Sequence, residues 1–272
     1  MLMAVVLAAP VQAQETDRQK VFYNMANSLG MLRGVNEVDT LMTLQAWGHG
    51  TMREVTATGV GPEMPLKSYY SESAYEFPGM RVDTVRGDGR RDIQVVSRLF
   101  AWNEIDTHGA GLTAESGKAV PAMETVTERL LRLWMTPAGV VKAARAAGDQ
   151  AKITVENGRT VVTFPLVNGK PENTTHLVAG ELAGTPVKLT LDAMYRPARV
   201  EVTFRGRTYA NTYSGYADLN EADYKADIFM PNKMVRTVDG QAVLDVTIDK
   251  TNTYNPYVIM PVPPAVQKAG AR

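Results

Sequence analysis

The chain has no cysteine among its 272 residues. This absence excludes disulfide bonds, thiolate nucleophiles, cysteine-based zinc sites and lipid attachment at a cysteine. A folded chain of this kind must draw its stability from a packed core, and a content of 44% hydrophobic residues is enough to build one. We therefore expect a sizeable globular core.

A surplus of charge and a long apolar run are also missing. Lysine plus arginine equals aspartate plus glutamate, at 29 each. A chain of zero net charge has no general attraction for nucleic acid or for an anionic membrane. The basic run at residues 86–91 contains Asp88, and we interpret it as a solvated turn in preference to a phosphate-binding patch. We expect no nucleic-acid partner and no transmembrane segment, because no run is long enough to span a bilayer.

Familiar catalytic motifs are absent too. The sequence has no Gly-x-Ser-x-Gly elbow, phosphate loop or dinucleotide-binding glycine pattern. The best chemical cluster is Glu104, Asp106 and His108, since alternate residues of an extended strand place three metal-capable side chains on one face. Gly109 and Gly111 follow and are equally typical of a polar loop. We predict no cofactor, and we favour a non-enzymatic role over a metal-dependent one.

The N-terminus has the pattern of an export signal. Residues 1–13 are short and apolar and end in Val11-Gln12-Ala13, which matches the small-residue rule for a cleavage site. A basic segment normally precedes such a signal, so the missing one is consistent with a start codon further upstream. We expect export to the periplasm or the extracellular space.

Helical periodicity is confined to two regions, about 18–32 and 119–147. The second is interrupted at Thr136 and Pro137, because threonine can cap free backbone N–H groups and proline is tolerated at the first helical position. A new helix should begin there. Gly148 should end it, since glycine adopts a left-handed conformation without a steric penalty.

Elsewhere the hydrophobic pattern alternates with a period of two, which predicts about a dozen antiparallel strands. The pairs Asn157-Gly158 and Asp239-Gly240 favour two-residue hairpins. We predict a mainly β protein with helices, of the α+β class, in which one large curved antiparallel sheet or half-open barrel wraps a helical insert. Residues 14–256 should form a single domain, and the proline-containing residues 257–272 an extended tail or linker.

Five segments carry a resemblance to known proteins: 29–34, 79–83, 91–104, 133–137 and 239–248. Together they resemble the N-terminal region of a group of secreted bacterial metallo-β-lactamase-fold proteins. The resemblance implies a non-catalytic accessory domain, because the His-x-His-x-Asp-His signature of the hydrolase domain is missing. In outline the strand pattern is also similar to periplasmic carriers of the LolA type, in which a curved antiparallel sheet wraps helices around an apolar cavity.

Two functional hypotheses follow. The first is an exported non-catalytic domain that packs against a hydrolase partner, or binds a lipid-like or other apolar small molecule in its concave face. Trp47, Trp102 and Trp134 are the candidate ligand contacts, although large aromatic residues fill ordinary cores as well. The alternative is a free-standing metal-dependent hydrolase that uses the cluster of Glu104, Asp106 and His108.

We expect the protein recovered from the periplasm of a bacterial host to begin at Gln14, because the cleavage rule places the cut after Ala13. The intact mass of the purified protein measures this directly. A mass that still includes residues 1–13 would contradict the prediction.

Overall fold

The computed structural model describes residues 15–56, 59–105, 118–168, 180–220, 227–253 and 255–271. Within them, thirteen strands form one antiparallel sheet whose two edge strands do not pair with each other. From one edge to the other, the strands are β10 (Lys118–Pro121), β9 (Phe100–Ile105), β8 (Arg91–Ser97), β7 (Gly79–Arg86), β6 (Met64–Ala74), β3 (Thr43–Met52), β17 (Gln241–Asn252), β16 (Phe229–Val238), β15 (Arg207–Asp218), β14 (Pro197–Phe204), β13 (Pro186–Leu191), β12 (Arg159–Pro165) and β11 (Lys152–Glu156).

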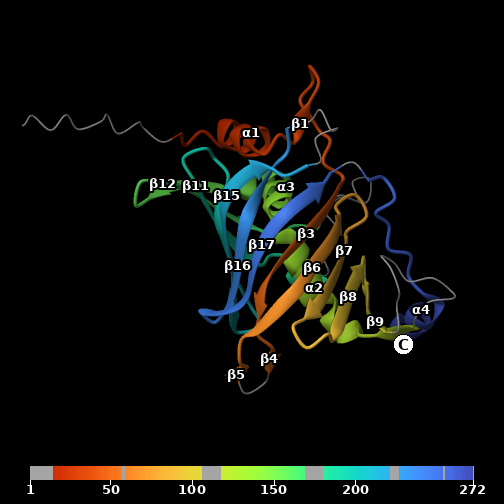
Figure 1. Cartoon of the computed structure of the whole chain (residues 1–272). Helices are drawn as coiled ribbons and strands as arrows, with labels where there is room; N and C mark the ends of the chain where they lie inside the picture. The colour runs from red at the N-terminus through yellow and green to blue at the C-terminus, as the bar shows by residue number, and fades with distance from the viewer. Residues whose placement is uncertain are drawn as a thin grey trace, which may run out of the picture.

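The sheet curves around two helices, α2 (Val126–Trp134) and α3 (Pro137–Ala147), as Figure 1 shows. A third helix, α1 (Arg18–Ser28), packs against α3. The predicted fold class is therefore confirmed: the protein is mainly β, with a large curved antiparallel sheet that stays open. No helix in the described part of the chain is long and apolar enough to cross a bilayer.

Two short hairpins lie outside the large sheet. One pairs β1 (Leu32–Arg33) with β2 (Val38–Asp39), and the other pairs β4 (Val55–Thr56) with β5 (Gly59–Val60). The second belongs to the excursion of residues 53–63 between β3 and β6, which we call the flap. The flap projects from one end of the large sheet (Figure 1).

Hairpin turns form where the sequence predicts them. Asn157 and Gly158 have φ angles of 50° and 74° between β11 and β12. Asp239 and Gly240 have φ angles of 51° and 80° between β16 and β17. Both turn positions need positive φ so that the turn twist matches that of the strands, which explains the choice of these residues.

The two predicted helical regions are shorter than expected. Helix α1 ends at Ser28 instead of residue 32, because Gly30 has a φ of 71° and a side chain there would collide with the carbonyl of Asp227. The region predicted over 119–147 opens with strand β10, since Pro121 biases the residue before it toward an extended conformation. A single 3-10 turn, Met123–Thr125, then leads into α2.

The predicted break inside the second region is confirmed. The hydroxyl of Thr136 accepts a hydrogen bond from the Gly139 backbone N–H at 3.1 Å, and Pro137 is the first residue of α3. Gly148 follows the helix with a φ of 53°. Two further 3-10 turns in the described part of the chain are Gly148–Gln150 and Gly180–Leu182.

The C-terminal tail, predicted to leave the sheet as an extended segment or linker, instead returns to it. Pro263 and Pro264 begin a helix, α4 (Pro264–Gly270), because proline is well suited to the first helical turn. Val266 of this helix is fully buried against Ile93, Val95 and Trp102.

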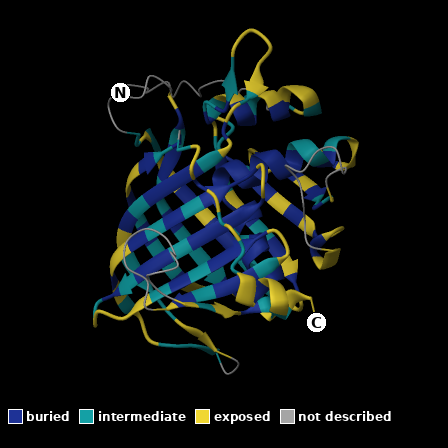
Figure 2. Cartoon of the chain, turned by 90° about the vertical axis from the view of Figure 1, so that its right-hand side faces the viewer, coloured by how far each residue is buried: buried dark blue, intermediate teal, exposed yellow. Residues whose placement is uncertain are grey.

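The main core lies between the helices and one face of the sheet, which we call the inner face. Leu44 and Ala46 of β3 point to this face, together with Val246 of β17, and they pack in one cluster with Leu130 and Val140 of the helices. Burial alternates along the strands, as Figure 2 shows, because successive side chains point to opposite faces.

The corner between α2 and α3 is held by side chains of the sheet. The carbonyl of Met135 accepts hydrogen bonds from the Asn211 amide, at 3.3 Å, and from the hydroxyl of Tyr213. The hydroxyls of Tyr75 and Thr136 are hydrogen-bonded at 3.0 Å. A helix end leaves backbone carbonyls without partners inside the helix, so a buried end needs such external donors.

We expect Y213F to destabilise the protein by about 1–3 kcal/mol, because it leaves the buried Met135 carbonyl with the longer bond from Asn211 alone. Urea unfolding followed by circular dichroism measures the loss. Y209F is the matched control: the Tyr209 hydroxyl makes no hydrogen bond with a described residue, so its removal should cost less than about 0.5 kcal/mol. Equal losses in both variants would contradict this account.

Candidate functional site

The predicted metal cluster is only partly within the described residues, since Asp106 and His108 lie outside them. Glu104 lies on β9, is 7% exposed, and accepts hydrogen bonds from Arg81 at 3.1 and 3.2 Å. Arg81 also faces Asp83 at 3.5 Å. Glu104 thus belongs to a buried ion pair, and the described part of the chain has no group of three potential ligands for a metal. The hydrolase hypothesis stays a prediction.

The three tryptophans lie in three different environments. Trp134 is buried in the main core, and Trp102 lies on the opposite face of the sheet beneath α4. Trp47 is partly buried and packs against Tyr70, with their ring centroids 5.0 Å apart. None of the three lines either of the two cavities described next. Their role as ligand contacts stays a prediction.

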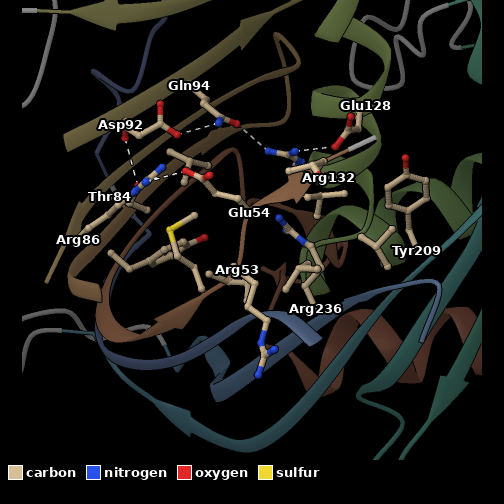
Figure 3. A pocket seen from close by; sticks show the side chains of 18 of the residues that line it. Arg53, Glu54, Thr84, Arg86, Asp92, Gln94, Glu128, Arg132, Tyr209 and Arg236 are labelled. Carbon is tan, nitrogen blue, oxygen red and sulfur yellow. Dashed lines mark hydrogen bonds and ion pairs between the residues drawn. The ribbon is translucent and has the colours of Figure 1, made fainter. Parts of the chain in front are cut away.

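The larger cavity has a volume of about 590 Å³ and lies between α2, the flap and the inner face of the sheet (Figure 3). Its apolar lining comes from the strands and includes Met52, Val82 and Leu244. Its polar lining is dominated by five arginines. They are Arg53 in the flap, Arg86 on β7, Arg132 on α2, Arg207 on β15 and Arg236 on β16.

Four of these arginines form ion pairs. The pairs, by the shortest distance between nitrogen and oxygen, are Arg53 with Glu63 at 3.5 Å, Arg86 with Glu54 at 2.6 Å, Arg132 with Glu128 at 2.6 Å and Arg207 with Asp239 at 3.0 Å. Among the described residues Arg236 has no ion pair. Its Nε donates to the amide oxygen of Asn211 at 3.2 Å, and burial and the charge of Arg132 lower its pKa.

Arg86 is a second arginine with free hydrogen-bonding capacity. Its side chain is 10% exposed, and its Nε is buried without a hydrogen-bond partner in the described residues. A buried donor without a partner costs stability, so a ligand that accepts a hydrogen bond at this point of the cavity wall would recover part of that cost. The interpretation of residues 86–91 as a wholly solvated turn is therefore wrong at Arg86, which β7 directs into the cavity.

A chain of hydrogen bonds fixes the position of Arg132. The Gln94 amide donates to Asp92 at 2.9 Å and accepts from Arg132 at 2.8 Å, and Arg132 donates to Glu128 at 2.6 Å. Figure 3 shows this chain along one wall of the cavity. Burial disfavours ionisation of Glu128, but the nearby arginines together hold its pKa below the usual value. The pair of Arg132 and Glu128 is thus charged.

The second cavity is apolar and much smaller, about 50 Å³. It lies deeper between the sheet and the start of α3, and it shares Tyr69 and Arg236 with the larger cavity. Its volume is less than a tenth of that of the larger cavity, which is therefore the candidate ligand site. Side chains of α2 and α3 fill the rest of the hollow as part of the core.

Sequence reasoning missed this site because its arginines come from five separate segments. No two of them lie within a short motif, and each one alone is typical of a solvated surface. One sequence signal points to Arg236. It stands at the alternate position between Met234 and Val238, two apolar residues that are buried on β16, so its side chain is expected on the same face of the strand.

Comparisons with known proteins leave the family open. No family model matches the chain, and no curated protein matches its sequence. Fourteen chains of solved structures match it. One of them is the crystal structure of the Mycobacterium tuberculosis lipoprotein LppX, which is 12% identical, with a TM-score of 0.24 and coverage of 69% of this chain and 90% of that chain. At this TM-score the likeness defines neither the fold nor the ligand.

Two glutamates of the flap test the packing around the cavity. We expect E54A to destabilise the protein by about 1–2 kcal/mol, because it leaves the buried Arg86 without its carboxylate while Glu54 itself is half exposed. E63A is the matched control, since its partner Arg53 is 40% exposed and the pair should contribute less than about 0.5 kcal/mol. Urea unfolding of both variants measures the difference, and a cost for E63A as large as that for E54A would contradict the interpretation.

Proposed function

We propose that this chain is a binding protein for a small organic anion, held in the arginine-lined cavity on the inner face of the sheet. The observation that carries the proposal is Arg236, a guanidinium that faces the cavity and has no ion pair in the described residues. Arg236 is partly buried, so water screens its charge less than on an open surface, and an anionic ligand supplies a partner for it.

The size of the cavity supports an organic anion over an inorganic one. A volume of about 590 Å³ falls within the range typical of small-molecule sites. A bare phosphate or sulfate ion would fill only a small part of it. Met52, Val82 and Leu244 offer apolar contact to the rest of an organic ligand. A few charged groups beside an apolar wall are typical of sites that fix a ligand's orientation.

This proposal keeps the predicted binding role on the concave face but changes the chemistry of the ligand. The apolar cavity beside the site is much the smaller of the two, whereas the larger cavity presents guanidinium groups. Export, and association with a metallo-β-lactamase-fold hydrolase, remain proposals that rest on the sequence. The binding role does not depend on either.

The test uses 1-anilinonaphthalene-8-sulfonate, an organic sulfonate whose fluorescence rises when it is bound. We expect it to bind the wild-type protein and to bind R236M at least roughly tenfold more weakly, because methionine removes the guanidinium that has no ion pair. R199M is the control, since Arg199 pairs with Glu201 on the exposed surface. It should bind like the wild type.

Circular dichroism confirms that each variant is folded before binding is compared. R236K serves as a second variant, because it keeps the charge but loses the planar fork of donors and should show an intermediate affinity. Equal binding by the wild type, R236M and R236K would show that the sulfonate does not use this cavity and would overturn the proposal.

A further inference from the structure

We infer that the ligand is a phosphate monoester, with its phosphoryl group between Arg132 and Arg236 and its organic group against the apolar wall. This inference rests on the proposed function and narrows it from organic anions in general to one dianionic class. Figure 3 shows the guanidinium groups of Arg132 and Arg236 facing the same part of the cavity, one from α2 and the other from β16.

Arginines outnumber carboxylates in the lining of the cavity. Five arginines line the cavity, and the carboxylates in its lining are Glu54, Asp92 and Glu128, so guanidinium groups exceed carboxylates by two. The partners of Arg53 and Arg207 lie outside the lining, with side chains 55% and 47% exposed. Arg53 and Arg207 are themselves 40% and 37% exposed, so water and salt screen both members of these two pairs, which add little net charge to the cavity. The attraction for an anion inside therefore comes from Arg236, which has no ion pair among the described residues.

A sixth arginine strengthens the positive field behind the wall. Arg129 is buried beside Arg132 on α2, and its hydrogen bonds go to neutral groups: the carbonyls of Val95 and Trp102 and the Asn103 side chain. Burial and the charge of Arg132 lower the pKa of Arg129 to about 10. It therefore remains charged near neutral pH and adds to the attraction for an anion.

The free donors suit three phosphoryl oxygens better than a planar carboxylate. Arg236 uses one nitrogen, for Asn211, and Arg132 donates one bond from each of its two terminal nitrogens. The remaining N–H groups come from two side chains on different elements. A tetrahedral phosphoryl group offers three oxygens that point in different directions and can accept from both side chains at once, whereas the two oxygens of a carboxylate lie in one plane.

Arg86 and Tyr209 complete the polar contacts available to the ligand. The unpartnered Nε of Arg86 is a donor in the same lining. Burial raises the pKa of Tyr209, and Glu128 adds to that shift, so its hydroxyl keeps its proton and can donate near neutral pH. The ester's organic group then lies against Met52, Val82 and Leu244.

Phenyl phosphate and phenyl sulfate form a matched pair of probes, equal in shape but different in charge. Displacement of the fluorescent sulfonate gives the affinity of each. At pH 7.5 we expect phenyl phosphate to bind roughly tenfold more tightly, because its second proton leaves with a pKa of about 6. At pH 5 most of it is a monoanion, so the advantage should nearly vanish. Phenyl sulfate does not titrate in this range, so any change in its binding between the two pH values reports a change in the protein.

Equal affinities at pH 7.5 would overturn the dianion inference and leave the binding of organic anions intact. If neither probe binds, and R236M binds the fluorescent sulfonate as tightly as the wild type does, the dianion inference and the proposed function are both overturned. R132M should weaken phenyl sulfate binding and weaken phenyl phosphate binding much more, so that most of the preference for phosphate is lost, since it removes one of the two facing charges. R199M should keep the preference, and loss of the preference in R199M as well would contradict the assignment to this cavity.

A phosphate monoester can be a soluble metabolite or the headgroup of a lipid such as phosphatidic acid. Cosedimentation with vesicles of phosphatidylcholine containing one-tenth phosphatidic acid, compared with pure phosphatidylcholine, separates the two sources. Binding that needs the anionic lipid and is lost in R132M supports a lipid source. Phenyl phosphate binding without cosedimentation supports a soluble one. Cosedimentation that R132M and R236M leave unchanged would contradict recognition by this cavity.

Discussion

The need to satisfy buried backbone groups at the corner between α2 and α3 determines much of this structure. Both helices lie in the hollow of the sheet, so the last carbonyls of α2 cannot reach water. Asn211 and Tyr213 of β15 supply donors to Met135, and Tyr75 is hydrogen-bonded to Thr136. These contacts fix where the helices sit on the sheet, and burial of Leu, Val and Ala side chains then stabilises that position.

The same corner positions the binding site. Asn211 donates to the end of α2 and accepts from Arg236 through its amide oxygen, so one fully buried side chain links the helix corner to the cavity. Arg132 stands one helical turn before the corner, where Gln94 and Glu128 hold it. The two arginines are therefore held by rigid elements. The guanidinium of Arg236, which has no ion pair among the described residues, disfavours the empty protein, and burial of the large core offsets that cost.

Short sequence patterns predicted the elements whose backbone conformation depends mainly on adjacent residues. The hairpin turns at Asn157 and Asp239 follow from the backbone preferences of two adjacent residues. The start of α3 after Thr136 likewise follows from the capping threonine and the proline beside it. Contacts between residues far apart in the sequence determine the other elements. Gly30 ends α1 early because the carbonyl of Asp227 lies against it, and α4 forms where its Val266 can be buried. The arginine cavity depends on strand register across the whole sheet, which no single segment of the sequence encodes.

The most direct test of the central claim is nuclear magnetic resonance of the arginine side chains during a titration with phenyl phosphate. The account predicts that the Nε–H resonances of Arg86 and Arg236 shift in step as the ligand is added, because both face the cavity, while that of Arg199 on the exposed surface stays in place. Shifts confined to surface arginines, with Arg86 and Arg236 unmoved, would contradict it.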